Sequence, residues 1–286
     1  MSAISERQPL PSSGPTASEV NSARSVPLGG IKGVLGSVGE IAGFAGGVIR
    51  QLPETRKYAT EVLHQAGILV LSSGIIIWFM EFVVGGMCGT EASYTLKQVG
   101  APLYSGIFDA WCAVREMAPY MWGYIFAAKV GCGFVAEIGS MRIAEEVDAL
   151  EVMGIHSRVY LIGTRVLATW IAMPFLYVVG LGVMFAAEYL VTVKELGGVS
   201  DGGYLYIFWL YQNPADFTYS LMKIMAMGTA ITFVGCYYGF SSRGGPVGVG
   251  RNTAKSMMLN MVLIHIIGLA GTQLFWGLSP NVPVAN

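Results

Sequence analysis

Five segments of this chain are each long and apolar enough to cross a lipid bilayer, which restricts the folds open to it. A helical span needs about 20 predominantly apolar residues. The five segments cover roughly 67–88, 117–136, 159–187, 217–240 and 256–276. Backbone polar groups in lipid must be hydrogen-bonded within their own segment, so these spans are expected to be helices. The sequence therefore predicts an all-α integral membrane protein with five transmembrane helices.

The composition supports this class and excludes several others. Charged residues make up 12% of the 286 residues, against about 25% in soluble domains. The four cysteines stand singly with no CxxC spacing, which indicates packing residues and not a metal site or a disulfide framework. The three histidines are scattered and no nucleophile motif is present, so catalysis by this chain is not expected. No nucleic acid is expected as a partner.

The basic residues predict how the chain crosses the membrane. With the N-terminus inside, the outside loops carry only Lys97 and Lys194, with Arg115 and Lys223 near span ends. Cytoplasmic loops carry an excess of Lys and Arg, so we expect a multi-pass protein of the cell (inner) membrane with a cytoplasmic N-terminus and an extracytoplasmic C-terminus. The segments assigned to the inside hold Arg7, Arg24, Lys32, Arg50, Arg56, Lys57, Arg142, Arg158, Arg243, Arg251 and Lys255.

The chain divides into four parts. Residues 1–30 are rich in Ser, Pro and Ala and are expected to form a disordered cytoplasmic tail. Residues 31–57 have apolar residues at helical spacing, with many glycines on the other side, which favours an amphipathic helix in the membrane interface. A loosely ordered linker is the alternative. Residues 58–278 form the membrane domain, and 279–286 an extracytoplasmic tail.

A short polar stretch at 139–153 separates the second span from the third. Its apolar residues recur at Ile143, Val147, Leu150 and Met153, which is the spacing of an amphipathic helix. Such a helix lies at the cytoplasmic surface, where it can couple the membrane subunit to a soluble motor protein. A solvated loop helix is the alternative. The residues expected to make the coupling contact are Glu145, Glu146, Val147, Asp148, Leu150 and Met153.

Charged residues inside the spans are further candidates. Glu81 lies in the first span, Lys129 in the second, Glu137 at its inner end, and Glu188 at the outer end of the third. An ionisable group in lipid costs several kcal/mol unless it is paired or wetted, so each is a candidate functional residue. The alternative is an ion pair between helices, or snorkelling by Lys129 and Glu188.

A glycine-rich turn at 245–250 has the glycine spacing of a phosphate-binding loop. That motif needs Lys and then Ser or Thr after the last glycine, following a β-strand. Arg251 and Asn252 stand in those places, after a membrane span. Nucleotide binding by this chain is therefore not expected, and neither is a bound metal or cofactor.

The centre of the chain carries a series of short motifs, which are REMAP at 115–119, AAKVG at 127–131, AEIGSMR at 136–142, EEVDAL at 145–150, MGI at 153–155 and TRVLA at 164–168. These motifs resemble the MlaE/YrbE permease family, the membrane subunits of ABC transporters that work with MCE-domain proteins to move lipids. The resemblance runs from about residue 30 to 276. Two departures are Lys129, where the family usually has Arg, and His156-Ser157, where it often has Asp-Pro. The ending CYYGF at 236–240 with GGPVGVG at 244–250 is similar to the B-type YrbE subunit of actinobacterial Mce systems.

The resemblance implies a transporter half with several partners. These are a second, A-type permease subunit in a heterodimer, a cytoplasmic ATPase of the MlaF/Mkl type that holds ATP and Mg, and extracytoplasmic MCE-domain proteins. The cargo would be a fatty acid, a mycolate-like lipid, a sterol or a phospholipid, moved inward. With the lipid path at the subunit interface, we expect Trp78, Phe79 and Glu81 of the first span to line it. The alternatives are an ion-coupled transporter using Glu81, Lys129 and Glu137, or a membrane anchor for extracytoplasmic proteins.

Overall fold

The computed structural model describes residues 29–278, and every regular element in that range is helical. The predicted all-α class is therefore confirmed for this part of the chain. The predicted tails lie outside the described residues, except Gly29 and Gly30. Contacts divide the chain into Met1–Gly43 and Phe44–Asn286, and all packing described below belongs to the second unit.

The region predicted as an interfacial helix is helical. Helix α2 covers Gly29–Gln51, and the 3₁₀ helix η1 follows at Leu52–Tyr58. Pro53 lies in the first turn of η1, where its missing N–H costs no helical hydrogen bond. In the last turns of α2, Val48 is buried and the Phe44 ring lies 5.5 Å from that of Tyr237. This contact holds the end of α2 against α10.

The first two spans are longer than their apolar cores predict. Helix α3 runs over Ala59–Gln98, beyond the predicted 67–88 at both ends. The second span begins with the 3₁₀ turn η2 (Pro102–Tyr104) and continues as α4, α5 and α6, with the π-helical segments η3 and η4 between them. Their bounds are Ser105–Trp111 for α4, Cys112–Met117 for η3, Ala118–Phe126 for α5, Ala127–Gly131 for η4 and Cys132–Ile143 for α6.

The remaining helices complete the membrane domain. The third span comprises the π-helical η5 (Arg158–Gly163), α8 (Thr164–Tyr189) and the π-helical η6 (Leu190–Glu195). The short helix α9 (Asp201–Leu210) precedes the fourth span, α10 (Pro214–Phe240), and the fifth, α11 (Gly245–Trp276). Five helical segments of residues 29–278 are long and apolar enough to cross a membrane, as predicted.

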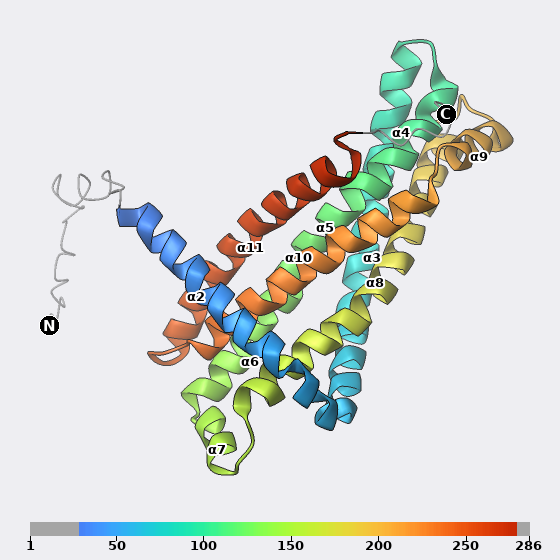
Figure 1. Cartoon of the computed structure of the whole chain (residues 1–286). Coiled ribbons are helices and arrows are strands. Elements are labelled where there is room, and N and C mark those ends of the chain that lie inside the picture. The colour runs from blue at the N-terminus through green and yellow to red at the C-terminus, as the bar shows by residue number, and fades with distance from the viewer. Residues whose placement is uncertain (1–28, 279–286) are drawn as a thin grey trace, which may run out of the picture. The chain divides into compact units, whose positions relative to one another are not determined.

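Helices α3 and α8 lie side by side, and glycines set their close approach (Figure 1). A Cβ on Gly85 would lie 2.5 Å from the Met184 carbonyl oxygen, and one on Gly89 would lie 3.0 Å from that of Glu188. Small residues let helix backbones pack closely in a bilayer, where van der Waals contact drives association. The glycines of α3 thus allow the first and third spans to pack closely.

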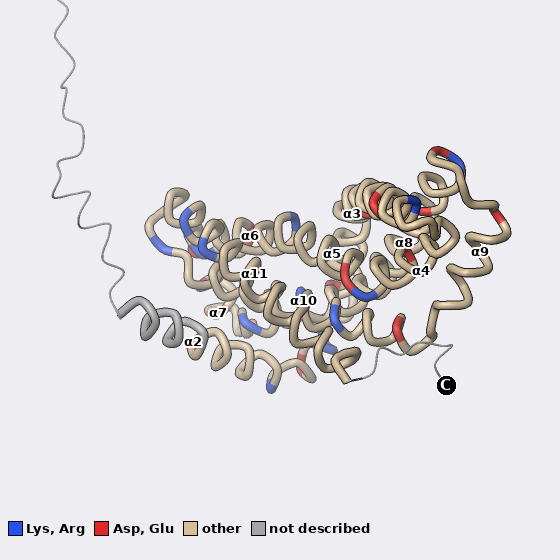
Figure 2. Tube along the Cα trace, turned by 90° about the horizontal axis from the view of Figure 1, so that it is seen from above, with Lys and Arg blue, Asp and Glu red and all other residues tan. Residues whose placement is uncertain are grey.

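The outward side of α3 is apolar along much of its length. Leu71, Ile75, Phe79 and Met87 recur at helical spacing and are all exposed. A helix face of this kind is stable only against lipid tails or another membrane helix. Most of the chain is uncharged, and the charged positions gather at a few places (Figure 2).

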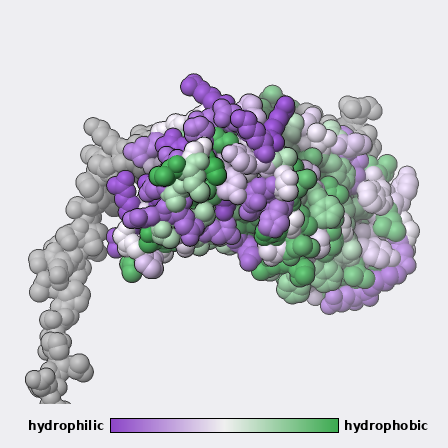
Figure 3. Space-filling model, turned by 90° about the horizontal axis from the view of Figure 1, so that it is seen from below, coloured by the Kyte–Doolittle hydropathy of each residue, from purple (hydrophilic) through white to green (hydrophobic). Residues whose placement is uncertain are grey.

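The basic segments gather at one end of the membrane domain. Figure 1 shows the start of α3, the turn between α10 and α11, and the short helix α7 (Glu146–Val152) at the lower end, while α4 and α9 lie at the other. Hydrophilic side chains collect over this lower end in Figure 3, beside a hydrophobic flank. The three segments that the charge pattern assigns to the cytoplasm therefore share one end.

Candidate functional site

The polar stretch between the second and third spans forms two helices instead of the single helix predicted over 139–153. Helix α6 ends at Ile143, and α7 begins at Glu146. Between them Glu145 has a φ of 60°, a left-handed conformation that non-glycine residues adopt rarely. Gly154 closes the unit with a φ of 79°. The chain therefore turns sharply before and after α7.

Side-chain contacts tie α7 to the membrane domain. Val147 is only 1% exposed and packs in the main hydrophobic core, and Leu150 is half-buried against that core. Arg142 donates to the Asp148 carboxylate at 2.5 Å, and Ser157 donates to Glu151 at 2.6 Å. The predicted coupling residues Val147 and Leu150 thus face the subunit itself, because the break at Glu145 turns the helix.

The outward side of α7 joins acids to exposed apolar side chains. Glu145 and Glu146 are exposed, while Val152 is 89% and Met153 is 66% exposed. We call these four residues the α7 surface. Acidic groups beside an uncovered apolar pair fit a partner that offers basic side chains around an apolar groove. The sequence pattern missed Val152, which lies off the predicted apolar stripe.

The three residues expected along the lipid path lie in different surroundings. Phe79 is 62% exposed on the outward side of α3, whereas Trp78 is half-buried and donates from Nε1 to the Leu176 carbonyl at 3.1 Å. Glu81 is 1% exposed, and within the described residues neither carboxylate oxygen has a hydrogen-bond partner. Its Cγ lies against Gly180 of α8. Phe79 is thus the exposed one of the three, while Trp78 and Glu81 pack towards α8.

The predicted intramembrane charges of the second and third spans also lie in different surroundings. Glu137 accepts from buried Arg165 Nη2 at 3.0 Å, so it belongs to an ion pair between α6 and α8. Lys129 lies in η4, is exposed, and lines a small cavity with Glu137. Glu188 is fully buried between α8 and α3. Among the residues that the structure describes, Glu137 is thus the one of these three that forms an ion pair between helices.

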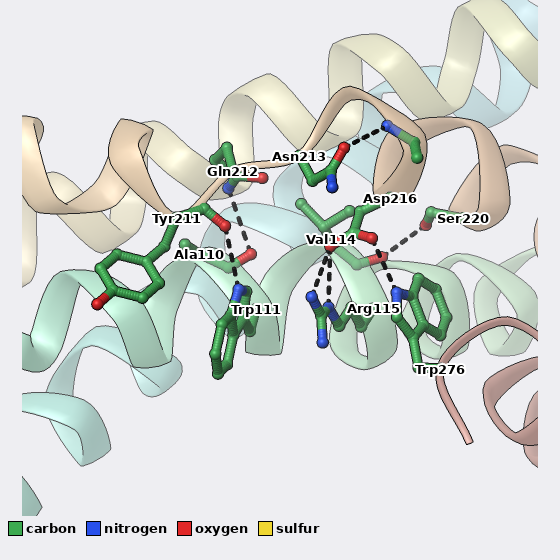
Figure 4. Close-up of polar contacts among 11 residues, drawn as sticks. Ala110, Trp111, Val114, Arg115, Tyr211, Gln212, Asn213, Asp216, Ser220 and Trp276 are labelled. Carbon is green, nitrogen blue, oxygen red and sulfur yellow. Dashed lines mark hydrogen bonds and ion pairs between the residues drawn. The ribbon is translucent and has the colours of Figure 1, made fainter. Parts of the chain in front are cut away.

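A charged cluster at the end of the second span predicted to be the outer one joins three spans (Figure 4). Arg115 Nη2 and Nε donate to one oxygen of Asp216 at 2.7 and 3.0 Å, and Trp276 Nε1 donates to the other at 2.8 Å. The guanidinium carbon lies 4.7 Å from the Trp111 ring centre and 5.4 Å from that of Trp276. Two indoles and a carboxylate thus surround a cation that would be costly alone in lipid.

The π-helical turn η3 supplies the second half of this cluster. Pro119, in the first turn of α5, has no backbone N–H to donate. Lys223 Nζ of α10 donates to the Arg115 carbonyl at 2.7 Å, and also to Thr272 at 2.9 Å and Glu116 at 3.2 Å. Thr272 in turn donates to Glu116 at 2.6 Å. The Glu116 side chain is 37% exposed, so the cluster has one open side.

Part of this cluster could be foreseen from the sequence. Arg115 and Glu116 belong to the REMAP motif, and Lys223 is a single cation in an apolar span. The pairing itself could not be foreseen, because Arg115 and Asp216 are 101 residues apart. We call Arg115, Glu116, Asp216, Lys223 and Thr272 the outer cluster.

Comparison with known proteins adds the following. The family described as Permease MlaE matches residues 62–274. A probable ABC transporter permease protein of Rickettsia bellii is 29% identical over 242 residues, which are 84% of this chain and 92% of that protein. A probable ABC transporter permease protein of Synechocystis is 32% identical over 152 residues, 53% of this chain and 57% of that protein. The chloroplastic protein Trigalactosyldiacylglycerol 1 of Arabidopsis thaliana is 29% identical over 162 residues, 57% of this chain and 46% of that protein.

Proposed function

Since this chain belongs to the MlaE permease family, we propose that it is the membrane half of an ATP-driven transporter that carries lipids inward across the cell envelope. The observation that carries the proposal is the α7 surface. It is an acidic and apolar projection between two spans, at the end that collects the basic segments. A membrane subunit that relies on a separate ATPase needs a surface that the ATPase can bind, so that conformational changes driven by ATP hydrolysis reach the membrane helices.

The partner at the α7 surface is a cytoplasmic ATPase of the MlaF/Mkl type, which binds ATP and Mg. In this proposal Glu145 and Glu146 contact basic residues of the ATPase, and Val152 and Met153 enter its apolar groove. Asp148, Val147 and Leu150 hold α7 in place through Arg142 and the core. The N-terminus and α7 lie in the cytoplasm of an inner-membrane protein, as the basic residues predict.

The other proposed partners are a second permease subunit of the A type and extracytoplasmic MCE-domain proteins. The exposed apolar side of α3, with Phe79, and the open side of the outer cluster at Glu116 support a subunit interface that lines a lipid path. Trp78 and Glu81 take part as supports of the α3–α8 pair. The Arabidopsis relative carries the name of a galactolipid, which favours a lipid as the cargo.

Affinity purification of this chain from its native host tests the proposal. We expect a nucleotide-binding subunit, a second permease subunit and MCE-domain proteins to co-purify in fixed ratio. The variant Glu146→Lys/Met153→Asp should lose the nucleotide-binding subunit and keep the others, because it removes both an acid and an apolar contact at the α7 surface. Glu91→Lys, an exposed acid at the far end of α3, is the control. Recovery of the ATPase with the double variant would refute the assigned contact.

A further inference from the structure

A cavity of about 100 Å³ lies between α3 and the η4–α6 part of the second span. Its polar lining comes from Gln65, Ser72 and Ser73 on one side and from Lys129 and Glu137 on the other, and Phe134 is among the apolar residues between them. None of its lining residues belongs to the outer cluster or to the α7 surface, so the roles of those two sites do not account for this cavity.

Two charged side chains, those of Lys129 and Glu137, are among the described residues that line the cavity. The Glu137 carboxylate is neutralised by Arg165 Nη2 at 3.0 Å. Lys129 forms no ion pair among the residues that the structure describes. The Gln65 amide donates to Glu61 at 2.8 Å, and the Ser72 and Ser73 hydroxyl oxygens lie 3.5 Å apart. One cation without an ion pair and several hydroxyl and amide groups therefore face a space large enough for a small anionic group.

The depth of Lys129 makes an unpartnered cation costly. Lys129 lies seven residues before Ala136, the inner end of the predicted span, which is about 10 Å into the apolar layer at 1.5 Å per residue. A lone charge at such depth must find an anion or water. The π-helical turn η4 sets the position of Lys129, and such turns occur frequently at functional sites.

We propose that this cavity binds the phosphate-bearing headgroup of an anionic phospholipid from the leaflet on the α7 side. Lys129 contacts the phosphate, and the hydroxyls of Ser72 and Ser73 donate to its oxygens. The space fits a phosphate and not a whole lipid, so the acyl chains run along the outward side of α3 at Ile68. This site goes beyond the proposed function, because its binding requires neither the ATPase nor transport.

Native mass spectrometry of the purified protein, with whatever subunits accompany it, tests this proposal. The complex is titrated with dioleoyl-phosphatidylglycerol or with dioleoyl-phosphatidylcholine. Wild-type protein should prefer the anionic lipid, and Lys129→Gln should weaken its binding about tenfold, the equivalent of one hydrogen-bonded charge. Lys129→Arg should retain binding. Lys255→Gln, which removes the same charge from an exposed site, should leave it unchanged.

A second variant fills the cavity without removing the charge. Gly133 lines it, and a Cβ there would meet nothing within 4 Å. Gly133→Leu should therefore fold normally and lose the preference for phosphatidylglycerol. Gly182→Leu is the matched control, since Gly182 is equally open and lines another cavity.

Three results would overturn the proposal. They are equal binding of the two lipids by the wild-type protein, undiminished phosphatidylglycerol binding by both Lys129→Gln and Gly133→Leu, and displacement of the lipid by inorganic phosphate alone. The last result would assign the cavity to a free anion. Loss of lipid binding with normal ATPase recovery would leave the transport proposal standing, so the two can fail separately.

Discussion

At the scale of single residues, the outer cluster shows how charges are kept inside an apolar span. Asp216 accepts three side-chain hydrogen bonds from Arg115 and Trp276, and Lys223 donates to the backbone carbonyl of Arg115. Each charge therefore depends on its partner. Removing one member of a buried pair leaves the other uncompensated, whereas replacing both by apolar residues is often tolerated.

This dependence predicts the stability of variants in the Arg115–Asp216 pair. Arg115→Met should lower the free energy of unfolding by about 3–5 kcal/mol, because the Asp216 carboxylate loses its cation. The double variant Arg115→Met/Asp216→Leu should recover much of that loss. Thermal unfolding in detergent, followed by tryptophan fluorescence, measures both. If Arg115→Met were as stable as the wild type, the ion pair would not contribute this free energy of unfolding.

Glu81 gives the opposite prediction, since it is buried and has no hydrogen-bond partner among residues 29–278. Glu81→Gln keeps the size of the side chain and removes the possibility of an unpaired buried charge, which is expensive in lipid. The midpoint of thermal unfolding should be equal to or above that of the wild type. Glu81→Lys should fail to accumulate in the membrane. A clear loss of stability in Glu81→Gln would mean that the carboxylate has an ionic role.

At the scale of elements, the packing of α3 on α8 depends on individual glycines. Gly85 and Gly86 are neighbours on α3, yet a Cβ at Gly85 would lie 2.5 Å from a carbonyl oxygen, whereas one at Gly86 would lie 3.5 Å from the nearest atom. Gly85→Ala should therefore cost about 1–3 kcal/mol through overpacking, and Gly86→Ala should be nearly neutral. Thermal unfolding of the two variants provides an internal control, and equal effects would contradict the packing described.

The short helix α7 shows what sequence periodicity can and cannot provide. The spacing of Ile143, Val147, Leu150 and Met153 predicts a helical stripe, and residues 146–152 are helical. The break came at Glu145, where no glycine, proline or asparagine signals a turn. Because the break rotates α7, Val147 faces the core and Val152 faces outward. Tertiary packing therefore decides which side of α7 is exposed, and the spacing of apolar residues could not predict it.

At the scale of the whole molecule, the positions of the apolar segments were sufficient to predict the number of membrane-spanning helices. Five apolar segments predicted five spans because lipid leaves the backbone few alternatives. The helices extend beyond the apolar cores, since capping and interfacial residues carry no hydropathy signal. The outer cluster and the Glu137–Arg165 pair join residues far apart in the chain, and a single sequence holds no information on which distant residues meet.

The topology predicts the labelling of two introduced cysteines. Ser200 precedes α9 and Ser241 follows α10, and both are exposed, at opposite ends of the membrane domain. In intact cells Ser200→Cys should react with a membrane-impermeant maleimide, and Ser241→Cys should react only after permeabilisation. The parent protein with its four native cysteines provides the background. Labelling of Ser241→Cys alone from outside would invert the orientation.

The central claim is that this chain moves lipid when a motor acts on α7. The most direct measurement is lipid transfer by the purified complex in vesicles, with ATP or with a non-hydrolysable analogue. We predict transfer with ATP only, and loss of transfer in Glu146→Lys/Met153→Asp while Glu91→Lys transfers normally. Transfer that proceeds equally without ATP hydrolysis, or equally well with the α7 variant, would contradict the account.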